Sequence, residues 1–230
     1  MSTAAPEPRL LTVGLGFTAG FVDTLGFIAL LSFFTAHVTG NFVLLGSALS
    51  QPTHGLIAKF LALPMFIVAV AAARLYGRSL ERRKRAAAFP LLILQATFLL
   101  VFMALGLFVA PITDADAPLA ILTALSGTVA MGIQNAASRT VFASLSPTTV
   151  MTGNVTQLVI DAVDLMGGGP DVTLNPVRAR VRHFWPPVVA FALGAAGGAL
   201  GYKFGGFASL LIPTALVIAL AIHTRVKPRA

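Results

Sequence analysis

Long apolar runs separated by short polar segments make up most of this chain. Six runs are long enough to cross a bilayer, which needs about 20 mainly apolar residues. The first run is too long for the core of a cleavable signal peptide, so we expect it to be a span. The pattern predicts an all-α polytopic membrane protein with six transmembrane helices. These runs are Leu10–Phe34, Leu56–Tyr76, Phe89–Ala110, Pro118–Ser138, Trp185–Tyr202 and Gly205–Ala221.

Two further apolar runs, Val38–Leu49 and Val150–Leu165, are too short to cross. Each contains the same polar tripeptide, Thr-Gly-Asn. The first copy is Thr39-Gly40-Asn41 and the second is Thr152-Gly153-Asn154. A polar motif shared by the two short runs sets them apart from the six long ones.

Lys and Arg residues beside the spans predict the orientation of the chain, because they are enriched in cytoplasmic loops. Basic clusters follow the second run, precede the fifth and close the chain, whereas the loop after the third run holds only Asp114 and Asp116. We therefore expect both termini to be cytoplasmic and that acidic loop to be outside. The basic residues are Arg74, Arg78, Arg82, Arg83, Lys84 and Arg85, then Arg178, Arg180 and Arg182, then Arg225, Lys227 and Arg229, with Arg9 before the first span.

This orientation leaves both ends of each short run on the same side of the membrane. The run with Thr39-Gly40-Asn41 enters and leaves on the outer side. The run with Thr152-Gly153-Asn154 enters and leaves on the inner side. Both are therefore predicted to be re-entrant half-helices.

The two halves of the chain also match in sequence. Gly20-Phe21-Val22-Asp23 resembles Gly132-Ile133-Gln134-Asn135, which aligns Asp23 with Asn135. Later, Phe66 and Ala69 align with Phe191 and Gly194. We infer one transmembrane domain, 1–230, with repeats at about 10–111 and 118–222. Three spans per repeat is an odd number, so the repeats have inverted topology, as in secondary transporters and some channels. The alternative is chance similarity between apolar segments of biased composition.

The paired motifs resemble those of the YoaK family of bacterial integral membrane proteins. The resemblance rests on Gly20–Asp23 with His37-Val38-Thr39-Gly40-Asn41, and on Gly132–Ala137 with Met151–Asn154. It covers nearly the whole chain. The resemblance implies about six spans and a location in the bacterial inner membrane, and it implies no particular activity.

The Thr-Gly-Asn motifs are candidate solute-binding residues. Thr and Asn are favoured helix N-caps, and Gly lets the backbone approach closely. Helices that begin at Thr39-Gly40-Asn41 and at Thr152-Gly153-Asn154 would bring two N-termini together near the midplane. Their free N–H groups favour an anion or a carbonyl-rich solute. The alternative is that these residues only bond to neighbouring side chains.

Asp23 is the acid that lies within a predicted span. Acids at this depth are costly and are candidates for function, so Asp23 is a candidate proton-coupling group. Its alternative role is structural, as an acceptor for backbone N–H groups at a half-helix start. His37 can titrate near neutral pH or donate to a solute, with interfacial packing as the alternative. Gln134 and Asn135 are adjacent on a helix, so we expect one to face the cavity and the other a neighbouring helix.

Two other features carry expectations. Asp161 and Asp164 have no counterparts in the first repeat, and we expect them to be solvated at the inner interface. Pro186-Pro187 follows Trp185, and proline is common in the first turn of a helix. We therefore expect the fifth span to begin there.

Composition supports the membrane assignment and excludes several classes. Hydrophobic residues make up 57% and charged residues 10%, against about 25% charged in soluble domains. The net charge of +8 lies in short tracts between apolar runs, so it does not indicate nucleic-acid binding. The chain has no cysteine, which excludes disulfides and thiolate metal sites. We find no enzyme motif and expect no catalytic residue, metal or cofactor.

These observations predict a small secondary transporter or channel that moves a small solute through a midplane site between the half-helix N-termini. An anion or a carboxylate is the favoured class. The alternative is a non-transporting scaffold, an assembly factor or a lipid-interacting protein. The expected partners are the lipid bilayer, a small-molecule or ion solute, and a second copy through small-residue helix faces. Gly16-x-x-x-Gly20 is expected to serve close helix packing. The expected location is the bacterial inner membrane.

Overall fold

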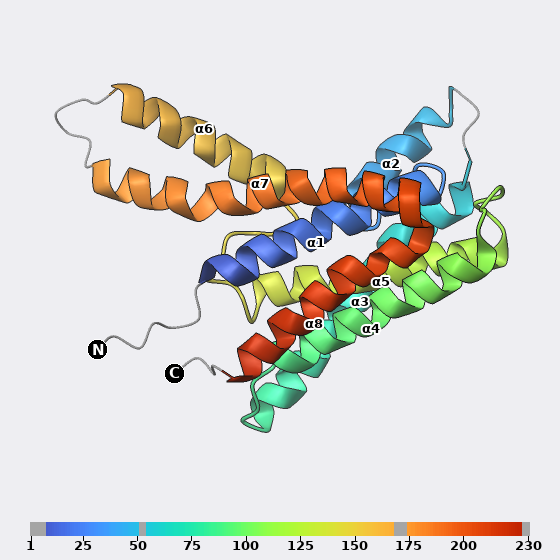
Figure 1. Cartoon of the computed structure of the whole chain (residues 1–230), viewed down its shortest axis with the longest axis horizontal. Coiled ribbons are helices and arrows are strands. Elements are labelled where there is room, and N and C mark those ends of the chain that lie inside the picture. The colour runs from blue at the N-terminus through green and yellow to red at the C-terminus, as the bar shows by residue number, and fades with distance from the viewer. Residues whose placement is uncertain (1–7, 51–53, 168–173, 227–230) are drawn as a thin grey trace.

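The chain folds as a bundle of helices joined by short connections (Figure 1). The computed structural model describes residues 8–50, 54–167 and 174–226. It shows an all-α protein whose long apolar helices make it a polytopic membrane protein. The elements are α1 (Pro8–Ala29), α2 (Val38–Ser47), α3 (Leu56–Arg82), α4 (Ala88–Val109), α5 (Pro118–Arg139), α6 (Met151–Gly167), α7 (Leu174–Gly205), the 3₁₀ turn η1 (Gly206–Leu210) and α8 (Leu211–Val226).

Five stretches of the described residues are long and apolar enough to cross a membrane. Four of them correspond to α1, α3, α4 and α5. The fifth, Asn175–Arg225, includes α7, η1 and α8, and Figure 1 shows α8 running back beside the bundle after η1. Since α8 has only 16 residues, the sixth span remains a prediction.

The first predicted span, Leu10–Phe34, is too long by five residues. α1 ends at Ala29, and residues 30–37 form a non-helical segment before α2. Leu31 and Ser32 have positive φ values of 52° and 68°, a backbone conformation that no right-handed helix contains. The apolar composition of this segment concealed the break.

The expectation that a helix begins at Pro186-Pro187 is wrong. α7 begins at Leu174, and both prolines lie inside it. Proline removes a backbone N–H donor but is tolerated in membrane helices when neighbours compensate. The extension before the prolines packs on α6, which provides the additional contacts.

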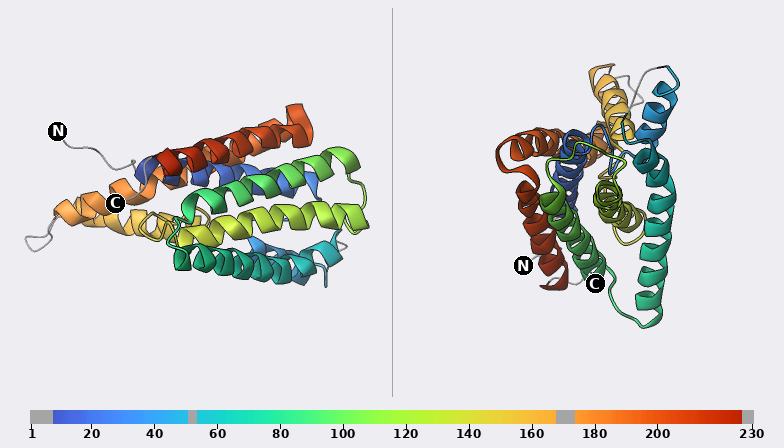
Figure 2. Two further views of the ribbon diagram at one scale, coloured as in Figure 1. Left: turned by 90° about the horizontal axis from the view of Figure 1, so that it is seen from below. Right: turned by 90° about the vertical axis from the view of Figure 1, so that its right-hand side faces the viewer.

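Packing partners recur in the two halves of the chain. α1 packs most extensively on α7, and α5 packs on α3 and α4. α2 lies against α3, α6 lies against α7, and α4 contacts α8. Figure 1 and Figure 2 show α2 and α6 on one side of the bundle. The short helices therefore rest on the second long helix of their own half.

Glycines let α1 and α7 touch through their backbones. A Cβ atom at Gly20 would lie 2.1 Å from the carbonyl oxygen of Phe191, and one at Gly194 would lie 2.1 Å from that of Phe17. At Gly198 the corresponding distance to the oxygen of Phe21 is 2.3 Å. Small residues permit such close crossings in membrane bundles. The close helix packing expected of Gly16-x-x-x-Gly20 is thus seen at Gly20, between two helices of one chain.

The second half makes the matching contact at Gly132. A Cβ atom there would lie 2.8 Å from the Cβ of Ala69 and 3.5 Å from the carbonyl oxygen of Phe66. The sequence comparison aligns Gly132 with Gly20, and Phe66 with Phe191. Positions that align between the halves therefore sit at corresponding helix crossings.

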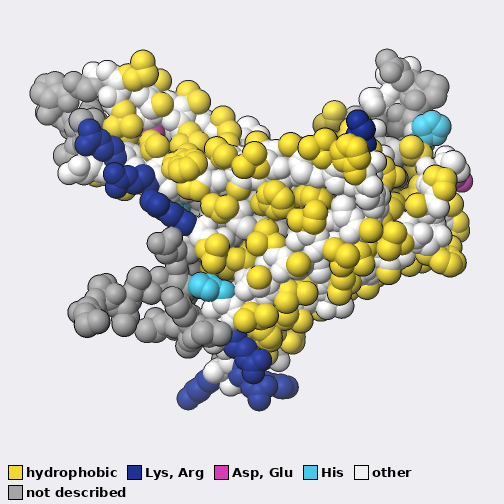
Figure 3. Space-filling view, viewed as in Figure 1, with side chains coloured by type: hydrophobic (Ala, Val, Ile, Leu, Met, Phe, Trp, Pro, Cys, Tyr) yellow, Lys and Arg dark blue, Asp and Glu magenta, His cyan; other side chains and the backbone are white. Residues whose placement is uncertain are grey.

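Basic side chains gather at one end of the molecule. Most visible Lys and Arg side chains in Figure 3 lie at its left end, where α1 begins and α3 and α8 end. Lys203, in the last turn of α7, lies toward the other end, as do Asp114 and Asp116 in the loop between α4 and α5. Lys227 and Arg229 lie outside the described residues. This separation agrees with the expected orientation, which remains a prediction.

Single cysteines test the orientation, because the chain has none of its own. Thr113→Cys lies in the acidic loop and Ala86→Cys in the basic loop, and both positions are exposed. We expect a membrane-impermeant maleimide to label Thr113→Cys in right-side-out vesicles and Ala86→Cys in inside-out vesicles. The reverse pattern would invert the assignment, and labelling of both sites from one side would contradict the odd number of intervening spans.

Gly194→Ala tests the helix crossing. The added methyl group meets the backbone of Phe17, so we expect the free energy of unfolding to fall by about 1–3 kcal/mol. Gly46→Ala is the control, since nothing lies within 4 Å of its Cβ position. Thermal unfolding in detergent measures both. Equal melting temperatures for the two variants would show that the crossing relaxes without cost.

Candidate functional site

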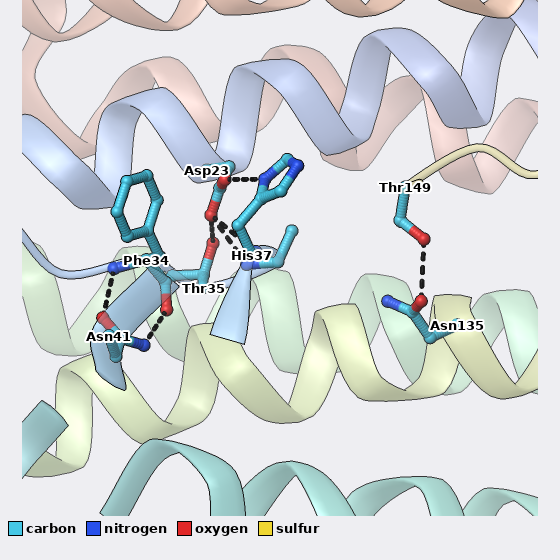
Figure 4. Close-up of polar contacts among 8 residues, drawn as sticks. Asp23, Phe34, Thr35, His37, Asn41, Asn135 and Thr149 are labelled. Atoms are coloured by element: carbon cyan, nitrogen blue, oxygen red, sulfur yellow. Dashed lines mark hydrogen bonds and ion pairs between the residues drawn. The ribbon is translucent and has the colours of Figure 1, made fainter. Parts of the chain in front are cut away.

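The carboxylate of Asp23 holds the non-helical segment that leads into α2 (Figure 4). Asp23 is 4% exposed and lies on α1, six residues before that helix ends. Its Oδ1 accepts the backbone N–H of Ala36 at 2.7 Å, the hydroxyl of Thr35 at 3.2 Å and, at 3.4 Å, the N–H of His37. The predicted structural role of Asp23 is therefore seen directly in these bonds.

The second oxygen of Asp23 faces an imidazole. His37 Nδ1 lies 2.6 Å from Asp23 Oδ2. When the carboxylate is ionised it can only accept, and the ring then donates to it from Nδ1. The His37 side chain is 41% exposed, whereas that of Asp23 is 5% exposed. The pair thus connects a buried acid to an accessible base.

Asn41 fixes the same segment from inside α2. Its Oδ1 accepts the N–H of Phe34 at 3.0 Å, and its Nδ2 donates to the carbonyl of Phe34 at 2.9 Å. Asn41 is fully buried. The side chain therefore replaces the two backbone bonds that Phe34 loses by leaving the helix.

The second half contains a related but simpler arrangement. Asn135 stands in place of Asp23, and its Oδ1 accepts the hydroxyl of Thr149 at 2.7 Å. Thr149 follows Asn135 by 14 residues, as His37 follows Asp23. Asn154 donates to the carbonyl of Pro147 at 2.7 Å, over the same seven-residue separation as Asn41 and Phe34. Figure 4 shows the first-half cluster as a network and the second-half pair as a single bond.

Gln134 belongs to a different buried network. Its Nε2 donates to the carbonyl of Leu15 at 2.8 Å and to Thr148 Oγ1 at 3.0 Å, and its Oε1 accepts from Gln95 Nε2 at 2.7 Å. Gln95 on α4 was not predicted from the sequence, because a single amide in an apolar run forms no recognisable motif. Gln134 therefore ties α5 to α1 and α4.

The remaining Thr-Gly-Asn residues lie in the first turns of their helices. α2 begins at Val38 and α6 at Met151, so both helices start ahead of the motif, and His37 rather than Thr39 is the N-cap of α2. Thr39, Thr152 and Gly153 are exposed, and Gly40 is half-buried. The expectation that the motif provides N-caps is wrong, because its Asn side chains reach back to the connection before each helix.

Asp161 is not solvated, contrary to expectation. It is fully buried, and its Oδ1 accepts from Arg180 Nε at 2.9 Å, Arg180 Nη2 at 2.7 Å and Gln157 Nε2 at 3.0 Å. This forked contact joins α6 to the extension of α7. Asp164 is half-buried. The partner of Asp161 is 19 residues away, at a spacing that no helical periodicity reveals.

Three hollows lie away from Asp23. The largest, about 460 Å³, is an apolar groove between α3 and α4 over α5. One of about 450 Å³ lies near Arg74, Arg85 and Arg139, and one of about 240 Å³ lies between α1 and α7. None of the three is lined by Asp23, His37 or Asn135. Asp23 is thus enclosed by protein, whereas the His37 side chain is 41% exposed outside these hollows.

Comparison with known proteins identifies the family. A family model described as a protein of unknown function (DUF1275) matches residues 11–223. This chain belongs to the DUF1275 family. The UPF0700 transmembrane protein YoaK of Bacillus subtilis (strain 168) is 35% identical over 163 residues, which cover 70% of this chain and 69% of that protein. The resemblance to the YoaK family is confirmed. No solved structure matches.

Family membership covers both clusters described above. The matched region includes Asp23, His37 and Asn41 in the first half and Asn135, Thr149 and Asn154 in the second. One relative is named as a transmembrane protein, which supports the assignment of this DUF1275 protein as an integral membrane protein. The chemistry of the site must be argued from its geometry.

The two Asn residues should contribute unequally to stability. Asn41→Ala leaves both polar groups of Phe34 without their partner, so we expect it to lower the free energy of unfolding by about 2–3 kcal/mol. Asn154→Ala leaves only the carbonyl of Pro147, which has no N–H, and we expect a loss of about 1 kcal/mol. Chemical unfolding in detergent measures the difference, with the exposed Thr39→Ala as a control. Equal losses would contradict this account.

Proposed function

We propose that this protein is a small secondary transporter in which the Asp23–His37 pair carries a proton. The observation that carries the proposal is the 2.6 Å contact between a buried carboxylate and an accessible imidazole. Acids within membrane proteins are costly to maintain, and they mark proton and solute pathways. The pair lies where the chain leaves α1 and enters α2, so its charge acts on a break between helices.

The proton step uses the two nitrogens of one ring. With Nδ1–H directed at the Asp23 carboxylate, Nε2 of neutral His37 is an acceptor. A proton that arrives from the exposed side binds Nε2, and the pair changes from one negative charge to none. Release of that proton to the other side restores the negative charge. The histidine is suited to this step because imidazole titrates near neutral pH.

The same carboxylate links the proton to the backbone. Asp23 Oδ1 holds the N–H groups of Ala36 and His37 while Oδ2 faces the imidazole. A change in the charge of the pair therefore changes how strongly α1 holds the start of α2. This coupling is what a proton-driven conformational step requires.

We also propose that the chain comprises six spans in two inverted repeats, about 10–111 and 118–222, with α2 and α6 as re-entrant half-helices. The matching helix partners and the corresponding crossings at Gly20 and Gly132 support this arrangement. The length of α2, 10 residues, supports a segment that enters and leaves on one side. In such folds the solute site lies between the repeats.

A small anion or a carboxylate remains the favoured solute. We expect it to contact the start of α6 rather than the start of α2. In the first half, the Asp23 carboxylate occupies the amides before α2. In the second half, neutral Asn135 occupies the corresponding position and bonds to the Thr149 hydroxyl. Thr152 and Gly153 are exposed in the first turn of α6, where N–H groups favour negative charge. In this proposal the protein's own carboxylate, Asp23, occupies the start of α2, and a solute binds at the start of α6.

A non-transporting scaffold is the second candidate. It is favoured by the close packing around Asp23 and by the buried Gln95–Gln134 network, which joins three helices without an open cavity. A transporter in an occluded conformation has the same appearance, so flux measurements must separate the two.

Asp23→Asn separates a proton carrier from a structural acceptor. The amide keeps an oxygen for the N–H of Ala36 but cannot form the charged pair with His37. In liposomes with a luminal pH dye, we expect succinate, glutamate, phosphate or sulfate to drive proton entry with the wild type. We expect Asp23→Asn to lose proton entry while retaining downhill exchange of the same solute, with a stability loss of about 1 kcal/mol.

Asp114→Asn is the matched control, because it removes an exposed acid from a connecting loop. It should behave as the wild type. Identical pH profiles for the wild type and Asp23→Asn would remove Asp23 from the transport step. No flux with any of the four probes would favour the scaffold.

A further inference from the structure

A small hollow lies between the first turn of α1 and the middle of α7. Its volume is about 240 Å³, and its lining comprises Arg9, Thr12, Ala179, Arg182, His183 and Pro186. It opens at the end of the molecule where the basic side chains gather, beside the arm formed by α6 and α7 (Figure 3). Neither the site around Asp23 nor the proposed proton step uses these residues.

The hollow carries positive charge from two arginines. Within the described part of the chain, its lining contains no carboxylate. Ion pairs there join His37 to Asp23, Arg74 to Glu81 and Arg180 to Asp161, so Arg9 and Arg182 stand outside them. Two guanidinium groups and an imidazole that converge on one hollow are suited to bind a phosphate, since arginine matches its planar pairs of oxygens.

Apolar side chains extend from the hollow toward the bilayer centre. Val13 follows Arg9 by one turn and is 38% exposed. On α7, Val189 and Leu193 follow Pro186 at helical spacing and are 44% and 62% exposed. Trp185 is 48% exposed beside the hollow, as is typical of residues at the membrane–water interface. A ligand with a phosphate in the hollow would thus have an apolar surface beneath it.

We propose that this hollow binds the headgroup phosphate of an anionic phospholipid, with an acyl chain along Val13, Val189 and Leu193. Exposed apolar side chains on the two helices that line the basic hollow favour a lipid over a free phosphate, which would have no use for them. Basic pockets between helices at the membrane surface bind anionic headgroups in this manner. The bound lipid would contact α1 and α7 at the basic end of the molecule, ahead of their glycine crossing on both helices.

Lipid retention measures this binding directly. Purified protein is equilibrated with mixed micelles of phosphatidylglycerol and phosphatidylcholine, and the lipids that remain bound are counted by native mass spectrometry. We expect the wild type to prefer phosphatidylglycerol. Arg9→Gln combined with Arg182→Gln should lower that preference by at least about tenfold, because two charge-assisted contacts are lost.

Two matched variants control for folding and for general surface charge. Arg9→Lys combined with Arg182→Lys keeps the charge and should keep most of the preference. Arg82→Gln combined with Arg83→Gln removes two exposed charges at the same end of the molecule and should leave the preference unchanged. An equal loss in this second pair would overturn the site in favour of diffuse surface attraction.

Inorganic phosphate distinguishes a lipid site from a site for a soluble phosphate. We expect millimolar inorganic phosphate to leave phosphatidylglycerol retention unchanged, since it cannot use the exposed apolar side chains. Displacement of the lipid by phosphate would overturn the lipid assignment, as would an unchanged preference in the glutamine pair. These measurements use no transport assay, so they stand or fall separately from the proposed proton step.

Discussion

The arrangement around α2 depends on one buried carboxylate that accepts backbone N–H groups. Within a bilayer, a chain that leaves its helix must find partners for its polar groups inside the protein. Asp23 and Asn41 supply these partners from the two helices that flank the break, at Ala36 and Phe34 respectively. Without them, the segment between α1 and α2 would leave the amides of Phe34 and Ala36 without these partners.

Each half has a polar side chain that bonds to the connection before its short helix, but the chemical groups differ. The first half combines a carboxylate with an imidazole, whereas the second combines an amide with a hydroxyl, at the same 14-residue separation. An amide and a hydroxyl do not change their charge within the physiological pH range. Of these two clusters, the one in the first half alone can therefore respond to a change of pH in that range. The two halves therefore differ in the chemistry of their corresponding clusters, even where the spacing of the residues is the same.

Much of the helical layout follows from the sequence, because helices α3, α4 and α5 coincide with apolar runs within a few residues. The sequence also identified Asp23 and both Asn residues of the repeated motif, since polar groups are conspicuous in an apolar context. The end of α1 at Ala29 could not be predicted, because residues 30–34 are as apolar as a span. The break is visible in the backbone alone, in the positive φ values of Leu31 and Ser32.

Long-range partners were also beyond the reach of the sequence. The burial of Asp161 depends on Arg180, and Gln134 depends on Gln95, 39 residues earlier. Hydropathy treats such residues one at a time and cannot show which of them meet. The start of α7 was missed for a related reason, since its extension before Pro186 is held by contacts with α6 rather than by its own composition.

The backbone contact at the glycine crossings bears on how the bundle can deform. α1 meets α7 with no side chain between them at Gly20 and Gly194, whereas α5 meets α3 at Gly132 through the Cβ of Ala69. Helices interlocked at this distance resist sliding and rotation, so each pair behaves as a rigid rod assembly. Both pairs contain one helix from each half of the chain. The closest glycine crossings of this protein thus join its two halves to each other, so neither half packs as a separate unit.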